Sequence, residues 1–176
     1  MANIVAQGIG VVNFAVYLKG TSRLLGLANV ELPNIEYETI EMKGTGLMGT
    51  LTMPVRGNLN SLEMKLTWRT LEKEAAEITK HQSISLSLYS DQEHYDGGTG
   101  QFSDPKHQIE VVGVPKVLNL GKWEPSATVD AETTLEVVTL KYSIKNKTVL
   151  EFDKMNYVFK INGADQTAAL RTALGM

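Results

Sequence analysis

Regular alternation of apolar and polar side chains is the feature that most constrains the fold of this chain. In the segment SLEMKLTW, residues 61–68, every second position from Leu62 to Trp68 is apolar, and the positions between them are polar or charged. Successive side chains of a β-strand point to opposite faces. The pattern therefore predicts a strand with one face buried and the other in water.

Similar patterns recur along most of the chain and predict a mostly β, antiparallel fold, either a sandwich or a barrel. We expect Asn146-Lys147 to form a hairpin turn. We also expect the apolar residues at alternate positions from Met155 to Ile161 to share one face. The segments predicted to be extended are residues 11–18, 22–32, 61–68, 83–89, 108–114, 134–144 and 155–161.

Two segments have helical spacing instead. Residues 70–81 predict one helix inserted midway, with Thr70 as its N-cap, and residues 164–176 predict a C-terminal helix capped by Asp165. Residues 90–107 and 120–132 are predicted to be loops. With 176 residues and no low-complexity linker, we expect a single domain over 1–176.

Composition narrows the possible functions. The chain has no cysteine, which excludes disulfides, thiolate metal sites and thiol catalysis. Its net charge is -3, so it lacks the basic character of a protein that binds nucleic acid irrespective of sequence. We expect no secretory signal and no membrane anchoring, because no apolar run approaches the roughly 20 residues that span a bilayer.

A glycine motif raises the possibility of a phosphate-binding loop. Gly44, Gly46 and Gly49 have the spacing G-x-G-x-x-G. This motif binds phosphate only where the glycines lead into a helix. Pro54 and the β-branched residues around it favour extended chain instead, so we predict a glycine-rich loop or hairpin.

Other candidate chemistry is weak. Asp91, Glu93, His94 and Asp96 form the densest group of potential metal ligands, but their spacing does not match a calcium-binding loop, and we interpret them as a hydrated polar segment. Neither a catalytic serine motif nor a pair of metal-binding histidines is present. We predict no catalytic residues, no metal site, no cofactor and no enzymatic activity.

One stretch is unusually apolar for a glycine-rich segment. We predict an extended β-hairpin, about residues 40–60, that makes contacts between subunits, because an exposed apolar arm on a monomer invites aggregation. The residues alone leave open whether this arm instead folds back onto its own core. The predicted contact residues are Met42, Gly44, Gly46, Leu47, Met48, Gly49, Leu51, Met53 and Pro54.

The two tryptophans have different settings. Trp68 lies in register with the apolar positions of its strand, which predicts a core position. Trp123 lies in the loop-like stretch GKWEPSA, where it packs against either its own domain or a neighbour. We take Trp123 as a second candidate for contact between subunits.

Several stretches together resemble the major tail tube protein of contractile-tailed bacteriophages and R-type bacteriocins. They are VNFAVYLKG, LLGLANVELPNIE, EMKGTGLMGTLTMPVRGNLNSLEMKLTWRT, GVPKVLNLGKWEPSA and DKMNYVFKINGADQTAALRTALGM. The resemblance runs from about residue 3 to residue 176 and is weakest over roughly 72–107.

This resemblance implies a structural protomer that forms hexameric rings, which stack into a rigid hollow tube driven through a bacterial envelope. It implies that the partners are further copies of the chain, a sheath protein, a baseplate or hub, a tape measure and a tube terminator. In a phage, DNA would pass through the lumen without specific binding. The particle would be a virion tail or a bacteriocin, assembled in the cytoplasm of the bacterial host.

Two alternatives stay open at this point. One is the tube protein of another contractile injection system, of the type VI kind, which would have the same fold. A monomeric ligand-binding β-barrel is a different class of protein. A closed apolar pocket in a protein that stays monomeric would distinguish it from a tube protomer.

Overall fold

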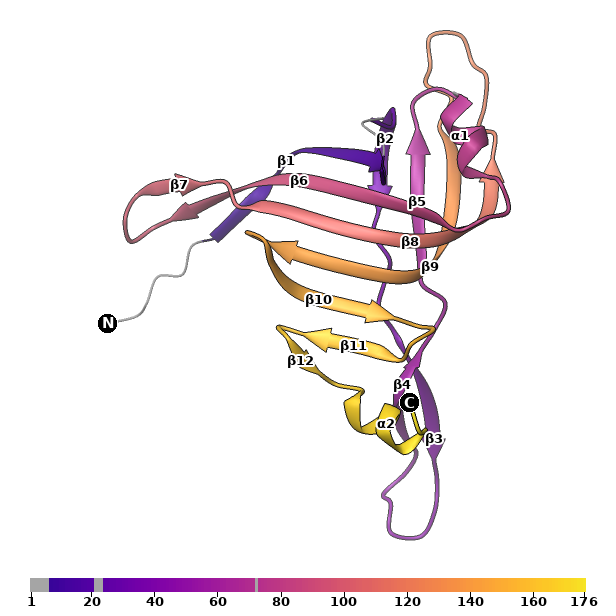
Figure 1. Ribbon diagram of the computed structural model, residues 1–176, viewed down its shortest axis with the longest axis vertical. Helices are drawn as coiled ribbons and strands as arrows, with labels where there is room; N and C mark the ends of the chain where they lie inside the picture. Colours follow the sequence, from indigo (N-terminus) through magenta and orange to yellow (C-terminus); the bar gives the residue numbers. More distant parts are fainter. Residues whose placement is uncertain (1–6, 21–23, 72) are drawn as a thin grey trace.

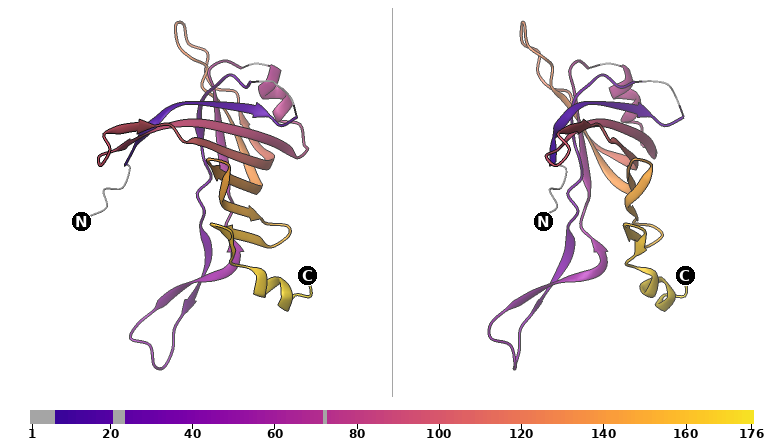
Figure 2. Two further views of the ribbon diagram at one scale, coloured as in Figure 1. Left: turned by 60° about the vertical axis from the view of Figure 1, so that its left-hand side comes forward. Right: turned by 90° about the vertical axis from the view of Figure 1, so that its left-hand side faces the viewer.

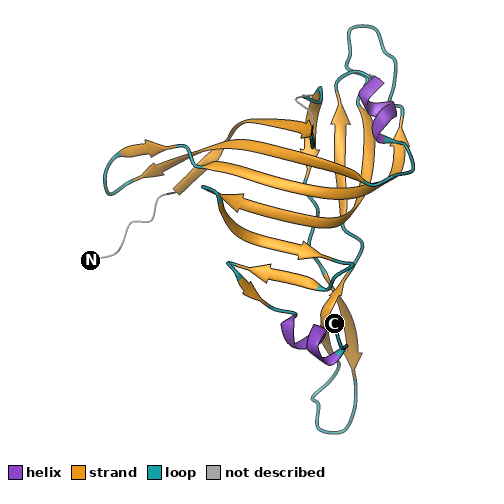
Figure 3. Ribbon diagram, in the orientation of Figure 1, coloured by secondary structure: helices purple, strands orange, loops and turns teal. Residues whose placement is uncertain are grey.

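Antiparallel strands dominate the described part of the chain, and two short helices lie at its periphery (Figure 3). The structure is a computed structural model and describes residues 7–20, 24–71 and 73–176. Ten strands of these residues form one large curved sheet, whose main path runs β1-β6-β8-β9-β10-β11-β12 (Figure 1). The remaining two strands, β3 and β4, pair only with each other among the described residues.

The strands vary greatly in length, from short edge segments to strands that cross the whole sheet. Their bounds are β1 Gln7–Leu18, β2 Leu27–Glu31, β3 Tyr37–Met42, β4 Leu51–Leu59, β5 Glu63–Trp68, β6 Ile84–Asp96, β7 Gln101–Ser103, β8 Lys106–Asn119, β9 Ala131–Ile144, β10 Lys147–Asp153, β11 Val158–Ile161 and β12 Ala164–Asp165. The helices are α1 Lys73–Ile78 and α2 Ala168–Ala173. The predicted mostly β, antiparallel class with one inserted and one C-terminal helix is confirmed.

The apolar face of β5 lies in the core, as the alternation in residues 61–68 predicts. Met64, Leu66 and Trp68 of β5 are fully buried, whereas Glu63 is exposed. The Trp68 indole N–H donates a hydrogen bond to Thr133 Oγ1 at 3.0 Å, so its polar atom is satisfied inside the core. The predicted core position of Trp68 is confirmed.

Both helices are shorter than predicted. The first covers only Lys73–Ile78, and Ala75 and Ile78 are the residues that it buries in the core. The second begins at Ala168 with Thr167 as its N-cap residue, so the prediction that Asp165 caps it is wrong. Asp165 lies in β12 instead, where its Oδ1 accepts a hydrogen bond from Thr167 N at 2.9 Å.

The predicted loop at residues 90–107 is also wrong, because this segment is mostly strand. It contains the outer half of β6, the short strand β7 and the start of β8. The hairpin between β9 and β10 turns one residue earlier than predicted. Its central residues are Lys145 and Asn146, both with positive φ (49° and 63°), as a type I′ turn requires.

The predicted common face from Met155 to Ile161 does not exist. Residues 154–157 form a turn, and Tyr157 has a positive φ of 50°, which breaks the alternation before β11 begins. Phe159 is buried, but Met155, Tyr157 and Ile161 are exposed.

Candidate functional site

The hairpin of β3 and β4, with the loop between them, extends well away from the rest of the chain (Figures 1 and 2). We call residues 37–59 the arm. Its strands pair in the register Met42↔Leu51, Ile40↔Met53 and Thr39↔Pro54. The glycines of the G-x-G-x-x-G motif are therefore followed by a strand and not by a helix, which removes the basis for phosphate binding.

The arm makes almost no contact with its own body beyond its base. All residues from 38 to 54 are exposed, so the alternative that the arm folds back onto its own core is wrong for this structure. Met48, at the tip, has a relative exposure of 110%. The exposed large apolar residues of the arm are Ile40, Met42, Leu47, Met48, Leu51 and Met53.

The glycines shape the tip of the arm. Gly46 and Gly49 have φ values of 97° and 107°, a region that side-chain-bearing residues rarely adopt. A Cβ at either position would meet no neighbouring atom within 4 Å. Their role in the isolated chain is therefore to form the turn, and the space around them is open to a partner.

The base of the arm, in contrast, is held firmly. Tyr37 packs edge-to-face on Phe159, with ring centroids 5.9 Å apart, and Leu59 packs against the core. Asn60 N donates to Glu36 O at 2.9 Å, and the Lys154 ammonium donates to Asn60 O at 3.0 Å. These contacts fix the point at which the arm leaves the body.

An ion pair and two hydrogen bonds also hold the segment that follows the arm. The Lys154 ammonium lies 2.8 Å from a Glu136 carboxylate oxygen, and the same carboxylate accepts hydrogen bonds from Ser61 Oγ and Leu62 N. Burial alone would raise the pKa of Glu136, but the hydrogen bonds from Lys154, Ser61 and Leu62 bring it below its ordinary value. Glu136 is therefore ionised and ties the segment after the arm to β9.

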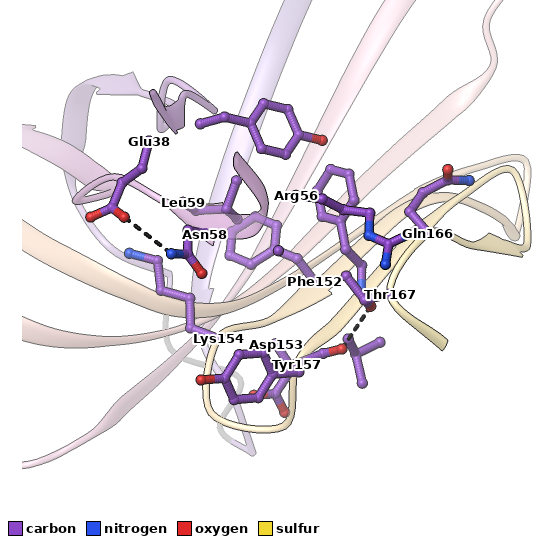
Figure 4. Close-up of a pocket in the computed structure, with 14 residues that line it drawn as sticks. Glu38, Arg56, Asn58, Leu59, Phe152, Asp153, Lys154, Tyr157, Gln166 and Thr167 are labelled. Carbon is purple, nitrogen blue, oxygen red and sulfur yellow. Dashed lines mark hydrogen bonds between the residues drawn. The ribbon is translucent and has the colours of Figure 1, made fainter. Parts of the chain in front are cut away.

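A cavity of about 260 Å³ lies between the arm base and the C-terminal part of the chain (Figure 4). Arg56, Asn58 and Leu59 line it from the arm, and Phe152 and Thr167 from the other side. Inside it, Asn58 Nδ2 donates to a Glu38 carboxylate oxygen at 3.2 Å. Thr167 Oγ1 also donates to the Tyr157 carbonyl oxygen at this cavity, so hydrogen bonds within the chain hold both of its sides.

Helix α2 closes the other side of this junction. Thr167 Oγ1 donates to Tyr157 O at 2.6 Å and accepts from Phe159 N at 3.0 Å, and Arg171 Nη1 donates to Tyr157 O at 2.8 Å. Leu170 of α2 contacts Gly57 in the arm so closely that a Cβ on Gly57 would clash with Leu170 Cδ2. The C-terminal helix is thus seated against the root of β4.

We expect Gly57→Ala to weaken the packing of α2 against β4 and to destabilise the fold. Gly57 has a φ of 89°, so alanine adds backbone strain of about 1–2 kcal/mol and also displaces Leu170. Gly49→Ala is the control, because its φ of 107° is similarly unfavourable but its surroundings are empty. Urea unfolding should show a loss for Gly57→Ala and little for Gly49→Ala, whose exposed tip opens locally. Equal losses would contradict a role for the contact with α2.

The ion pair of Asp165 and Arg171 predicts a pH dependence. The hydrogen bond from Arg171, followed by that from Thr167 N, holds the pKa of Asp165 well below its ordinary value of 3.8. The folded state therefore binds fewer protons than the unfolded state, and this stabilisation is present above about pH 4 and is lost as the pH falls below that value. In urea unfolding, Asp165→Asn should be less stable than the unmodified chain near neutral pH. The difference in unfolding free energy should shrink toward pH 3. A difference that does not depend on pH would contradict stabilisation by the ionised Asp165.

The other residues considered from the sequence do not form a common site. Trp123 is 87% exposed in the β8–β9 loop, far along the chain from the arm. Asp91, Glu93, His94 and Asp96 follow one another along β6, so their side chains are distributed over both faces of the sheet. Among the described residues, no group of three or more His, Asp or Glu side chains is arranged to hold a metal ion. No helix of the described residues is long and apolar enough to cross a membrane.

Comparison with known proteins identifies a family whose sequences resemble this chain. The sequence profile of a family described as Phage tail tube protein FII matches residues 10–175. The major tail tube protein of Serratia phage KSP20 is 21% identical over 150 residues, which cover 85% of this chain and 85% of that protein. The resemblance stated from the sequence is confirmed.

Two solved structures share the fold. The first, described as the sheath/tube terminator of the extracellular contractile injection system PVC in the extended state, has a TM-score of 0.53 and 15% identity, covering 79% of this chain and 99% of that chain. The second, from the PVC sheath-tube complex in the extended state, has a TM-score of 0.51 and 16% identity, covering 75% and 88%. At these identities the likeness shows the fold alone.

Proposed function

The chain belongs to the phage tail tube protein FII family, a family of structural proteins and not of enzymes, and from this premise we propose that it is the protomer of the inner tube of a contractile tail. The protomers form hexameric rings that stack into a hollow tube. The tube is driven through a bacterial envelope, and in a phage it conducts DNA. The whole chain, 1–176, acts as one tail tube domain that includes the arm.

The arm is the observation that best supports this proposal. Six large apolar side chains on a hairpin with residues 38–54 exposed are an aggregation hazard for a monomer. The hazard disappears where another subunit covers these side chains, and their burial then stabilises the contact between subunits. Methionine side chains adapt to irregular surfaces, which suits a contact repeated between successive rings. We propose that the arm contacts the adjacent ring.

The partners follow from the same proposal. The PVC structures are described as containing sheath, tube and terminator, so we propose a sheath protein and a tube terminator as partners of this chain, together with further copies of itself. A baseplate or hub and a tape measure complete the set. The particle is a virion tail or a phage-tail-like bacteriocin, assembled in the host cytoplasm. DNA makes no specific contacts in the lumen, consistent with a net charge of -3.

Negative-stain electron microscopy over a concentration series, combined with the mass in solution, tests the proposal. Rings or stacked tubes with an open lumen are the expected result. A stable monomer at every concentration would contradict self-assembly of the chain by itself. A monomer that binds a small apolar molecule would favour the ligand-binding β-barrel instead.

A further inference from the structure

Two histidines and a tyrosine, all outside the arm and its base, form a stack of rings that we call the histidine stack. The rings of His94 in β6 and His107 in β8 are nearly parallel, with centroids 6.1 Å apart. The ring of Tyr142 in β9 lies 5.9 Å from that of His107. Because β6, β8 and β9 are neighbours in the sheet (Figure 1), the stack joins three strands at the place where β8 begins and β9 ends.

His107 is the buried member of the stack, with an exposure of 5%. Its Nδ1 lies 2.6 Å from the Tyr142 hydroxyl oxygen. Its Nε2 is buried and has no hydrogen-bond partner among the described residues. Ser90, which is opposite His107 in the register of β6 with β8, does not supply one, because Ser90 Oγ is itself buried without a partner there. The described residues therefore offer the ring one hydrogen-bonding partner and not two.

This arrangement suits the neutral form of the His107 ring and not the charged form. A neutral imidazole has one N–H donor and one acceptor nitrogen, whereas an imidazolium has two N–H donors. The Tyr142 hydroxyl can pair with Nδ1 in either form, but an N–H at Nε2 would have no acceptor. Burying a charge without a partner costs far more than burying a neutral polar group. The site therefore opposes the uptake of a proton.

No carboxylate is placed to offset that cost. A groove of about 660 Å³ adjoins the His107 ring, and its described lining contains no Asp, Glu, Lys or Arg. His94 would repel a charge on His107 when it is itself protonated. Asp96 lies on the same side of β6 as His94 by alternation, but its Oδ1 accepts a hydrogen bond from Gly98 N at 2.8 Å in the next turn.

The remaining titratable groups of the surrounding elements do not face the His107 ring. They are either exposed in connecting segments or at strand positions that alternate with His107, Tyr142 and the groove, and so point to the other face of the sheet. These groups are Tyr17, Glu31, Glu36, Tyr89, Asp91, Glu93, Tyr95, Asp104, Lys106, Glu110, Lys141, Lys145, Lys147 and Glu151.

We propose that the histidine stack is an acid-sensitive contact: when His107 takes up a proton, its ring turns into the groove toward water, its hydrogen bond with Tyr142 breaks, and the start of β8 loosens from β6 and β9. The groove is open to solvent on the side where the ring would turn. This inference goes beyond the proposed function and does not depend on it, because it concerns a single protomer.

The direction of the pH dependence follows from the same surroundings. Burial, followed by the charge of His94, holds the pKa of His107 below its ordinary value of 6.5. Below that pH the folded state therefore binds fewer protons than the unfolded state. The stabilisation is complete above about pH 6.5 and is lost as the pH falls below that value.

His107→Gln tests the proposal, because glutamine keeps a hydrogen-bonding side chain but takes up no proton. Urea unfolding is measured at pH 7.5 and pH 5.0, at a concentration below assembly. Over this interval the unfolding equilibrium constant of the unmodified chain should rise about fivefold or more relative to that of the variant. The upper limit is about thirtyfold, for a ring that binds no proton while folded. An equal rise in both chains would overturn the inference.

His81→Gln is the matched control, because it makes the same substitution at an exposed histidine outside the stack. Its unfolding should have the same pH dependence as that of the unmodified chain. If the His81 variant instead lost the pH dependence as the His107 variant does, the assignment to His107 would be wrong.

Hydrogen exchange of the unmodified chain gives a second readout that does not require the variant to fold. Exchange of the imidazole C2 proton, followed by mass spectrometry, gives the titration midpoint of His107, which should lie below 6.5. After correction for intrinsic rates, amides at the start of β8 should lose protection at least tenfold between pH 7.5 and pH 5.0, and those of β5 should not. A midpoint at or above 6.5, or equal changes in both strands, would overturn the inference.

Discussion

Replacing Met48 and Leu51 with aspartate is expected to abolish tube formation while leaving the protomer folded. Both side chains are exposed in the isolated chain, so their loss removes no core packing. In a stacked tube they would be covered by the adjacent ring. Burying an unpaired carboxylate there costs several kcal/mol for each ion.

The expected magnitude is large because the penalty recurs at every copy in a ring. A penalty of about 4 kcal/mol at one contact corresponds to a thousandfold loss of affinity. We therefore expect the concentration needed for stacking to rise by at least three orders of magnitude, measured by sedimentation of tubes over a concentration series. Circular dichroism and the unfolding midpoint should be unchanged.

Thr45→Asp with Thr50→Asp is the control for charge on the arm. Both threonines are exposed and lie in the same tip, so the added charge is equal but no apolar side chain is lost. This variant should still stack. Tubes from the Met48 and Leu51 variant would contradict the role of the arm, and failure of both variants would show that charge, and not apolar contact, is decisive.

The sequence predicts the fold best where a strand has one buried and one hydrated face. Residues 61–68 alternate because Met64, Leu66 and Trp68 lie in the core while Glu63 lies in water. Residues 90–96 have no such contrast. They form the outer half of β6, which projects from the body, and apart from Tyr95 the side chains on both of its faces are polar, a pattern that predicts a loop.

At the C-terminus, tertiary contacts determine where the last helix begins, and the residue type at the expected cap does not. Asp165 has the residue type of an N-cap, but its carboxylate pairs with Arg171 and accepts from Thr167 N within the junction at β11. Helix α2 therefore begins later, at Ala168. Leu170 of this helix packs against Gly57. These two residues are too far apart in sequence for helical spacing to reveal the contact.

The arm can be predicted from the sequence only in part. The apolar content of residues 42–55 signals a contact surface, because a monomer gains nothing from exposing it. Whether this arm folds back could not be decided from the residues, since methionines and leucines suit a core equally well.

Trp68→Ala is expected to have the largest effect on the stability of the protomer itself. Trp68 is fully buried, and its indole N–H is bonded to the buried Thr133 Oγ1. Removing the side chain leaves a large cavity and an unpaired hydroxyl, at a cost of about 3–5 kcal/mol. For a chain of this size that cost lowers the thermal midpoint by about 6–20 °C. Trp68→Phe should cost less, because it keeps an aromatic ring in the core.

Trp123→Ala is the matched comparison, because it removes the same side chain from an exposed loop. With an exposure of 87%, its effect on monomer unfolding should stay within about 0.5 kcal/mol. Scanning calorimetry of both variants at a concentration below assembly checks the contrast. Equal destabilisation would contradict the burial of Trp68. If Trp123 contacts a neighbouring subunit, its alanine variant should instead raise the concentration needed for tubes, since an aromatic side chain that a partner covers contributes to binding and not to folding.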